Sequence, residues 1–506
     1  MMDDAMRKHI AFASMCVGLF IAQLDIQIVS ASLNDIGGGL SAGKDEMAWI
    51  QTSYLIAEII VIPLSGWLSR VFSTRWLFTV SAGIFTVMSM ACALAWNIQS
   101  MILFRAVQGA AGASMIPLVF TTAFIYYQGR ELGLAAAVVS ALASLSPTLG
   151  PTLGGWITDS LNWRWLFYIN ILPGAYLVLS IPFLVNIDKP DLSQLKGADY
   201  VGIILLAISL GSLEYTLEEG ARLGWLDDGI IMLTSSLSLV SFIGFTIRTL
   251  IISNPIMDLY AFKDKNFLLG CFFSFAGGVG IFSTVYLTPV FLGQVKGFSA
   301  VDIGLAVCTT GIFQIFSVPL YSYLSKKISL KWLLMAGLGG FSLSMYMFTP
   351  ITHQWGWYEL LFPQAIRGVS QQFAMAPIVT LTLGGLPRER LKLASGVFNL
   401  TRNLGGAIGI ALCGTILNNR TNFHYQRIGE KMVSVSDNIN EFITSSTSIF
   451  TLSGNDKTSS LLGATKLLSQ MLMREAQTMA FSDAFILISG LLLIAFILVP
   501  AMKGKS

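Results

Sequence analysis

Charged residues are scarce in this sequence of 506 residues. Asp, Glu, Lys and Arg make up 12% of the chain, whereas hydrophobic residues make up 54% and the mean hydropathy is +0.69. A soluble protein needs roughly 25% charged residues to cover its surface, so this composition excludes a water-soluble protein and indicates one that lies in a lipid bilayer. The net charge of +3 gives no strongly basic field, which excludes nucleic acid as a partner.

Patterns for metals, disulfides and nucleotides are also missing. All five cysteines fall inside apolar runs without CxxC spacing, and the three histidines are isolated. The segment from Gly38 to Asp45 is similar to a phosphate-binding loop, but Asp45 stands where that loop needs Ser or Thr to bind magnesium. We therefore expect no metal, no nucleotide and no other cofactor.

Long apolar stretches are what the sequence has in quantity. A helix needs roughly 20 apolar residues to cross a bilayer, and about fourteen stretches meet this criterion. They lie at residues 10–33, 48–68, 76–96, 100–126, 132–157, 165–187, 200–217, 229–250, 267–292, 301–324, 332–349, 358–383, 393–417 and 481–502. The first is longer than a signal-peptide core and no cleavage site follows it, so we expect it to be retained. An all-α, multi-pass membrane protein is predicted.

Lysine and arginine collect in alternate loops, and this asymmetry predicts the orientation of the chain. One side carries most of them, including those near both ends of the chain, while the short loops of the other side carry few. Positive loops remain in the cytoplasm. An even number of spans then places both termini on the cytoplasmic side of a bacterial cytoplasmic membrane.

The sequence also repeats itself. Leu68-Ser69-Arg70 and Arg75-Trp76-Leu77 match Leu324-Ser325-Lys326 and Lys331-Trp332-Leu333 at one constant offset. Chance similarity between two basic loops is the alternative, but a duplicated six-helix unit explains the match better and is common in secondary transporters. The predicted domains are an N-terminal six-helix bundle at 1–190, two inserted transmembrane helices at 191–255, and a C-terminal six-helix bundle at 256–506.

One connection differs from the others. Residues 418–480 form a long loop, rich in Ser, Thr and Asn, between the last two spans on the predicted outer side. Its second half, from Leu461 to Met479, spaces apolar residues as an amphipathic surface helix does. A helix that caps the bundle and an element that docks a partner are both compatible with this pattern.

Few ionised residues lie inside the predicted spans. Each costs at least ~2.5 kcal/mol near the bilayer midplane, so each needs a partner, a watery cavity or a function. The clear cases are Asp25, Glu58, Arg105, Arg367 and Arg402. The proton affinity of a buried carboxylate depends on which charges surround it, so Asp25 or Glu58 can couple proton movement to a conformational change. The alternative is a static ion pair of Asp25 or Glu58 with Arg105.

Polar neighbours at helical spacing extend these positions into stripes that suggest an interior pathway. The expected substrate-cavity residues are Gln51, Tyr54, Gln108, Asn399 and Arg402. In the fifth span, Gly150, Pro151, Gly154 and Gly155 place small residues beside a helix-bending proline. Small residues permit close contact between membrane helices, so this segment is expected to pack tightly, to bend, or both.

These residues resemble the motifs of the major facilitator superfamily, specifically its fourteen-spanner drug:proton antiporter branch of the EmrB/QacA type. The similar segments are Leu24-Asp25 with Ile28-Val29, Gly66-x-Leu68 with Arg70 and Arg75, Arg105-x-x-Gln108-Gly109, Gly150-Pro151-x-x-Gly154-Gly155, Trp163-Arg164-Trp165-x-Phe167-x-Ile169-Asn170, and Arg402-Asn403-x-Gly405-Gly406. Together, in this order, they cover essentially the whole chain.

The resemblance implies two six-helix bundles, two extra helices and alternating access driven by protons. It implies Asp25 and Arg105 as coupling residues and the fifth-span motif as a hinge or seal. The sequence departs from the family pattern at Arg70, where an acid is usual, and at Ser73, where glycine is usual, which puts locking of the closed state in doubt. Ser30, Asn34 and Ser146 also depart from the usual residues, which affects local helix geometry.

The expected function is proton-coupled export of hydrophobic or amphipathic compounds, driven by the proton gradient without a cofactor. Relatives of this kind in Gram-negative bacteria work with a periplasmic adaptor and an outer-membrane channel, which the 418–480 loop could dock. A transporter of one metabolite, a membrane-bound lipid-modifying enzyme and a non-transporting sensor are the alternatives. The enzyme would need clustered acids, and Glu214, Glu218 and Glu219 are the one such cluster, which we interpret as a solvated loop.

Overall fold

The computed structural model describes residues 4–252, 255–433, 436–452 and 456–502, and within them it contains helices and no strands. The N-terminal half comprises α1 (Asp4–Ile28), α2 (Leu33–Gly39), α3 (Lys44–Phe72), α4 (Thr74–Ala93), α5 (Ile98–Tyr126), α6 (Gly129–Ser160), α7 (Trp165–Tyr168) and α8 (Ile171–Leu184). The short α9 (Ser193–Lys196) precedes α10 (Tyr200–Leu223) and α11 (Gly229–Ile251). The C-terminal half comprises α12 (Lys265–Gln294), α13 (Ala300–Leu324), α14 (Leu330–Met347), α15 (Trp357–Leu383), α16 (Arg388–Val433), α17 (Ser436–Leu452) and α18 (Lys457–Leu498).

Each of the fourteen predicted spans coincides with one of these helices, the sixth with α7 and α8 together. Within the described residues, 12 helical segments are long and apolar enough to cross a membrane. The two remaining predicted spans, α14 and α15, pack against each other, and they join the bundle through contacts of α14 with α18 and of α15 with α13. The protein is therefore an all-helical, multi-span membrane protein.

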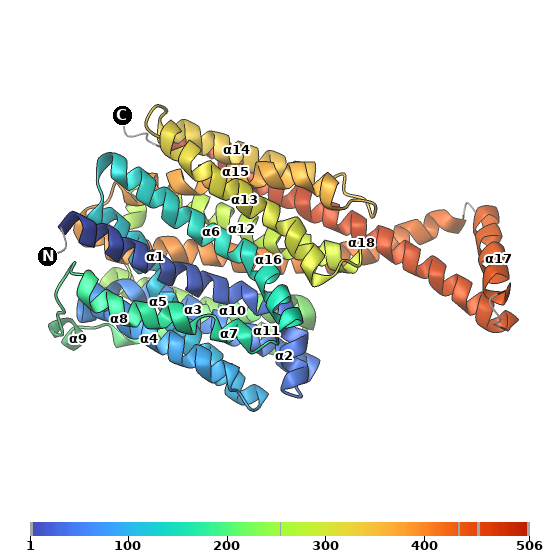
Figure 1. The fold of residues 1–506 in the computed structure, drawn as a ribbon, viewed down its shortest axis with the longest axis horizontal. Helices are drawn as coiled ribbons and strands as arrows, with labels where there is room; N and C mark the ends of the chain where they lie inside the picture. Colours follow the sequence, from blue (N-terminus) through green and yellow to red (C-terminus); the bar gives the residue numbers. More distant parts are fainter. Residues whose placement is uncertain (1–3, 253–254, 434–435, 453–455, 503–506) are drawn as a thin grey trace.

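The helices run roughly parallel to one long axis, and the start of α1 and the end of α18 lie at the same end of the bundle (Figure 1). The halves meet along two seams, where α6 packs on α13 and where α3 packs on α16. The pair α10 and α11 adds to the second seam, because α10 contacts both α3 and α16 while α11 contacts α10.

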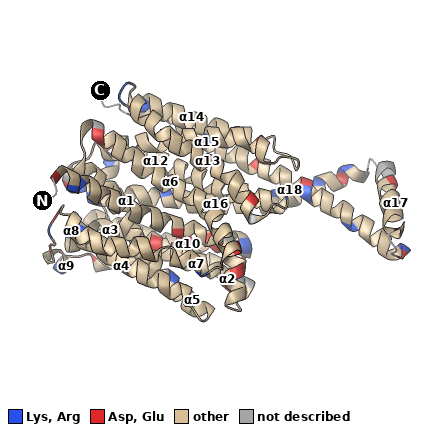
Figure 2. Cartoon of the chain, in the orientation of Figure 1, with Lys and Arg blue, Asp and Glu red and all other residues tan. Residues whose placement is uncertain are grey.

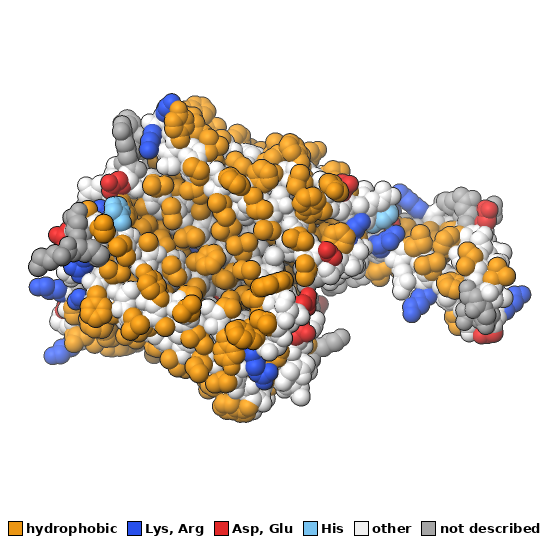
Figure 3. Space-filling view, viewed as in Figure 1, with side chains coloured by type: hydrophobic (Ala, Val, Ile, Leu, Met, Phe, Trp, Pro, Cys, Tyr) orange, Lys and Arg blue, Asp and Glu red, His pale blue; other side chains and the backbone are white. Residues whose placement is uncertain are grey.

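The surface of the bundle is apolar, as a lipid-facing surface must be. Figure 3 shows hydrophobic side chains over the body of the bundle, and Figure 2 shows charged residues gathered toward its ends and on α16 to α18. Exposed side chains such as Phe183, Phe316 and Ile251 are 77%, 72% and 80% accessible. Charged residues are scarce in the sequence because most of the protein surface is apolar and faces lipid.

The sixth span is divided, in contrast to the prediction of one helix over residues 165–187. The helix is interrupted between Tyr168 and Ile171. At this break the side-chain amide of Asn170 turns inward and donates hydrogen bonds to Asp25 and to Ser89. A periodic apolar pattern does not reveal such a break, because it contains no information on polar contacts with other helices.

The predicted long loop at 418–480 is wrong. Helix α16 continues through this segment to Val433, α17 follows, and α18 starts at Lys457, so the described part of the segment is helical. These helices form an arm that projects away from the bundle (Figure 1). Residues 461–479 are helical, but they belong to α18, which is continuous with the last span, and they do not cap the bundle. The arm is anchored at its base, where Asp483 accepts hydrogen bonds from Arg420 Nε at 2.5 Å and from His424 Nε2 at 2.8 Å.

Helix α6 lies against the end of α1 through two of its glycines. A Cβ atom on Gly150 would lie 2.5 Å from the Cβ of Gln27, and one on Gly154 would lie 2.1 Å from the carbonyl oxygen of Ile28. Since real Cβ atoms do not approach backbone this closely, the two helices could not pack in this way with larger residues. The motif therefore provides close packing, as small residues do in membrane helices.

We predict that Gly154→Ala lowers the free energy of unfolding by about 1–3 kcal/mol, because the added methyl group meets backbone that cannot rotate away. Thermal unfolding of the purified protein in detergent measures the change. Gly133→Ala in the same helix is the control, since its nearest neighbour is the Ser325 hydroxyl at 3.9 Å. Equal stability of the two variants would contradict the predicted role of this contact.

Candidate functional site

Asp25 of α1 lies at the centre of a buried polar network. It is 1% exposed, and its carboxylate accepts a hydrogen bond from Arg105 of α5 and forms an ion pair with it. Gln108 Nε2 donates to it at 3.2 Å and Asn170 Nδ2 at 2.6 Å. Every one of these partners is a donor, so together they favour the ionised carboxylate over the protonated acid.

Arg105 is held from several sides. Its Nε donates to the carbonyl oxygen of Ile50 at 3.2 Å, and its guanidinium carbon lies 4.2 Å from the centre of the Tyr54 ring. A Cβ on Gly109 would lie 2.4 Å from the Tyr54 carbonyl oxygen, so glycine at this position lets α5 approach α3. The guanidinium is thereby fixed beside Asp25 by packing as well as by charge.

Glu58 of α3 belongs to a different environment. It is 2% exposed, and its Oε1 accepts a hydrogen bond at 3.1 Å from Asn403 Nδ2 of α16, in the other half of the protein. Of the two acids that the sequence leaves open as partners of Arg105, the structure pairs Asp25. Glu58 instead joins the halves across the seam between α3 and α16.

Two connected cavities lie between the halves. The inner one, which we call the recess, has a volume of about 40 Å³, and the outer one, which we call the chamber, about 480 Å³. Both are lined by Gln27, Gln51, Glu218, Phe282 and Ile410. The recess accommodates a group of a few atoms, whereas the chamber falls within the range of small-molecule sites.

The chamber lies at the end of the bundle away from the termini. It is lined by Ala48 near the start of α3, by Ile303 near the start of α13 and by Arg222 near the end of α10. Pro151 of the fifth-span motif also lines it.

The opposite end of the seam is closed. Lys392 of α16 forms an ion pair with Asp188, and Arg70 NH2 donates to the carbonyl oxygen of Glu389 at 2.8 Å. A Cβ on Gly66 would lie 2.4 Å from the carbonyl oxygen of Lys392. Arg70 thus joins the two halves by donating to a backbone carbonyl. This end of the seam is closed even though residue 70 is not the acid that is usual there.

The expected cavity residues of the N-terminal half are divided between two environments. Gln51 lines both the recess and the chamber. Tyr54 lies under the guanidinium of Arg105, and Gln108 donates to Asp25, so both belong to the buried network and neither lines the recess or the chamber. Helical spacing identifies residues on one side of a helix, but it does not decide what that side faces.

The expected cavity residues of the C-terminal half also lie outside the lining of both cavities. Asn399 Nδ2 donates to the carbonyl oxygen of Ser395 at 2.9 Å, and the guanidinium carbon of Arg402 lies 5.5 Å from the centre of the Phe120 ring. Arg367-x-Val369 repeats the pattern Arg105-x-Val107 of the N-terminal half. Arg367 is 1% exposed, and none of its three side-chain nitrogens has a hydrogen-bond partner among the described residues.

The remaining motif residues lie within the N-terminal half. Arg75 NH1 donates to the carbonyl oxygen of Pro182 at 3.5 Å, which connects the start of α4 to the end of α8. Gly155 is buried in α6, next to the contact of Gly154 with α1.

Sequence reasoning missed several residues of the site. Gln27, Glu214, Glu218 and Asn403 line the recess, and Asn170 binds Asp25. The interpretation of the glutamates as a solvated loop is wrong, because α10 continues to Leu223 and buries Glu214 to 2% exposure and Glu219 to 3%. The signal was available: Glu214 and Glu218 are four residues apart at the end of an apolar helix and so share one of its faces.

The sequence matches the model of the Major Facilitator Superfamily over residues 15–410. The chain belongs to this superfamily. It is 37% identical to the colistin resistance protein EmrB of Acinetobacter baumannii over 83% of this chain and 82% of the relative. It is 29% identical to the multidrug export protein EmrB of Escherichia coli K12, with the same shares covered. The resemblance to the EmrB/QacA type is confirmed by these relatives.

Solved structures show the same fold. The human organic anion transporter MFSD10 superposes with a TM-score of 0.58 at 13% identity, covering 97% of this chain and 99% of that one. A bacterial homologue of the human lysosomal transporter Spinster, in an inward-facing and unoccupied conformation, superposes with a TM-score of 0.54 at 13% identity, covering 98% of each chain. Membership of this superfamily identifies the chain as a transporter.

We predict that Arg105→Met lowers the free energy of unfolding by about 3–5 kcal/mol, because it leaves the buried Asp25 without its countercharge. The double variant Asp25→Asn with Arg105→Met should recover part of this loss, since it leaves no buried charge. Chemical unfolding of the purified variants, arranged as a double-mutant cycle, measures the coupling.

Arg427→Met is the control for this cycle. Arg427 forms an ion pair at 3.5 Å with Glu430 on the arm, where the two side chains are 65% and 68% exposed, so its loss should cost about 0–1 kcal/mol. Additive effects of the Asp25 and Arg105 substitutions would show that the pair does not stabilise the bundle.

Proposed function

We propose that this protein is a proton-coupled antiporter that exports hydrophobic and amphipathic compounds across a bacterial cytoplasmic membrane. The observation that carries the proposal is the fully buried pair of Asp25 and Arg105 in one half of the bundle, next to a chamber between the halves. The curated relatives named multidrug export proteins support this choice of substrates. The proton gradient supplies the energy, and no organic cofactor takes part.

The proposed coupling begins with protonation of Asp25. A proton removes the negative charge that attracts Arg105 and Asn170, so both hydrogen bonds to the carboxyl group are weakened. Asn170 lies at the break between α7 and α8, and Asp25 lies one turn before Ile28, which contacts Gly154 of α6. A change at Asp25 is therefore transmitted to α8 and to the contact of α1 with α6.

Alternating access follows if this change opens the closed end of the seam. The contacts that close it, Lys392 with Asp188 and Arg70 with Glu389, are polar and connect the two halves directly. Polar contacts of this kind can be exchanged at low cost, since water replaces each lost hydrogen bond. The proposed orientation places both termini and this end in the cytoplasm, so that the chamber in this structure faces outward.

We predict that adding a transported drug to inverted membrane vesicles with an established pH gradient releases protons from the vesicles when they contain the parent protein. Asp25→Asn should abolish this release, because residue 25 can then no longer bind and release a proton. A pH-sensitive dye inside the vesicles measures the release. Glu430→Gln is the control, because Glu430 lies on the arm with 68% exposure. Proton release that persists in Asp25→Asn would exclude Asp25 as the coupling residue.

The arm is proposed to dock a periplasmic adaptor, which would connect the protein to an outer-membrane channel. The arm projects beyond the bundle on the side of the chamber, and exposed apolar side chains such as Leu452 and Leu462 are 88% and 67% accessible on it. A lipid-facing role does not explain them, because Lys and Arg residues accompany them along the arm (Figure 2).

We predict that replacing residues 428–470 by a short Gly-Ser linker leaves proton release in vesicles intact but abolishes drug resistance of whole cells, because the adaptor can no longer bind. The base of the arm, with Arg420, His424 and Asp483, is retained in this variant. Resistance and proton release are measured on the same strains. Full resistance without the arm would contradict its role in docking.

A further inference from the structure

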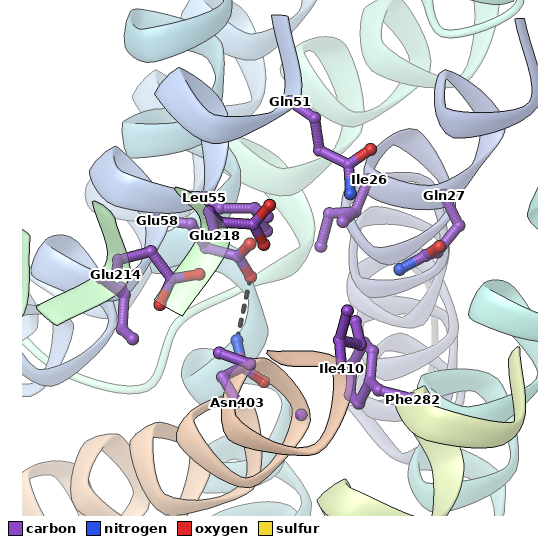
Figure 4. A pocket seen from close by; sticks show the side chains of 13 residues that line it. Ile26, Gln27, Gln51, Leu55, Glu58, Glu214, Glu218, Phe282, Asn403 and Ile410 are labelled. Atoms are coloured by element: carbon purple, nitrogen blue, oxygen red, sulfur yellow. Dashed lines mark hydrogen bonds between the residues drawn. The ribbon is translucent and has the colours of Figure 1, made fainter. Parts of the chain in front are cut away.

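Three carboxylates line the recess between the halves. Glu58 comes from α3, and Glu214 and Glu218 come from adjacent turns of α10, the first of the two inserted helices. Figure 4 shows the three side chains gathered on one side of the recess, with Gln27 and Phe282 across from them. The inserted pair of helices thus contributes two of the three acids in this cavity.

The charges of these acids are not balanced by basic residues in the lining. Thirteen residues line the recess, all within the part of the chain that the structure describes, and none is Lys, Arg or His. In the adjoining chamber, Arg222 forms an ion pair with Glu219 at 2.6 Å, so that its charge is already neutralised. Glu214 and Glu218 therefore have no basic partner in the lining, whereas Glu58 lies within electrostatic reach of Arg402 outside it.

Glu214 gives the clearest indication that the recess binds a ligand. Its side chain is 2% exposed, it is directed into the recess, and its Oε2 has no hydrogen-bond partner among the described residues. A buried oxygen without a partner costs free energy, and more so when the group is ionised. Glu58, in contrast, already binds Asn403. Glu214 is thus available to a positively charged ligand.

The remainder of the lining suits an organic ligand. Ile26, Leu55, Phe282 and Ile410 provide apolar walls, and the recess continues into the chamber of about 480 Å³. A metal ion is a poor alternative, because no group of three His, Cys, Asp or Glu side chains within the described residues is placed to hold one. A small cationic group fits the recess, and an apolar body fits the chamber.

We propose that the recess binds the charged group of amphipathic organic cations through Glu214 and Glu218 of α10, with Glu58 of α3 completing the site. This proposal deepens and rests on the proposed function, since it names a substrate class for the same cavity. The inserted helices then do more than fill the membrane: α10 supplies the charge that selects the ligand. Uncharged compounds would use the apolar chamber alone.

The test compares two ligands of nearly equal shape, (2-naphthylmethyl)trimethylammonium and its uncharged analogue 2-neopentylnaphthalene, in which carbon replaces nitrogen. Binding to the purified full-length protein in detergent is followed by naphthyl fluorescence, without a proton gradient. Replacing both glutamates, Glu214→Gln with Glu218→Gln, should weaken binding of the cation by about tenfold or more, which corresponds to loss of a close charge pair. Binding of the uncharged analogue should change less than about twofold.

Asp227→Asn is the matched control, because it removes a carboxylate just after α10 at an exposed residue that lines neither the recess nor the chamber. It should leave cation binding within about twofold of the parent. Unfolding temperatures of all variants check that they are folded, and Glu214→Gln alone replaces the double variant if the latter does not fold. Unchanged cation binding in the folded variant, or equal loss for both ligands, would overturn the proposal.

The two proposals fail in different ways. Equilibrium binding does not depend on proton coupling, so an antiporter with a neutral-only substrate list would still show drug-driven proton release while failing this test. Conversely, a protein that binds the cation selectively but releases no protons would support the recess as a cation site and would contradict the antiport mechanism.

Discussion

The ion pair of Asp25 and Arg105 is the interaction on which the N-terminal half depends. Two full charges lie in a bundle whose surroundings are apolar, and such a pair is tolerated only when its geometry is satisfied on every side. The carboxylate of Asp25 meets this condition, since Gln108 and Asn170 also donate to it. The guanidinium of Arg105 is fixed by Ile50 and Tyr54, although its NH2 has no hydrogen-bond partner among the described residues. Asn170, one of these partners, lies at the interruption of the sixth span.

The two halves have similar sequence segments but differ in the partners of their buried arginines. Arg105 has an acid beside it, whereas Arg367 at the corresponding place has no hydrogen-bond partner among the described residues. Both halves therefore carry a buried arginine, but among the described residues the carboxylate network surrounds only the one in the N-terminal half. The C-terminal half contributes instead to the seam, through Asn403 with Glu58 and Lys392 with Asp188.

The sequence allows the spans and the buried charges to be predicted, because the bilayer imposes one requirement on length and another on charge. Asp25, Glu58 and Arg105 stand out among apolar neighbours for this reason. The lining of the cavity could not be predicted, since it depends on how helices from two halves rotate against each other, and Gln51 is the one expected cavity residue that lines it. Residues 418–480 were misjudged because a polar composition describes a solvated helix as well as a loop.

The continuity of α16 has a mechanical consequence. This helix of 46 residues passes without a break from the closed end of the seam, at Arg388, to the arm, a length of about 70 Å at 1.5 Å per residue. One end of this rigid helix lies in the bundle and the other in the arm, so a rotation of the helix moves the arm. A tilt of the C-terminal half by about 10 degrees would swing the tip by roughly 10 Å over such a length, so a small rotation within the bundle would become a large displacement at its outermost part.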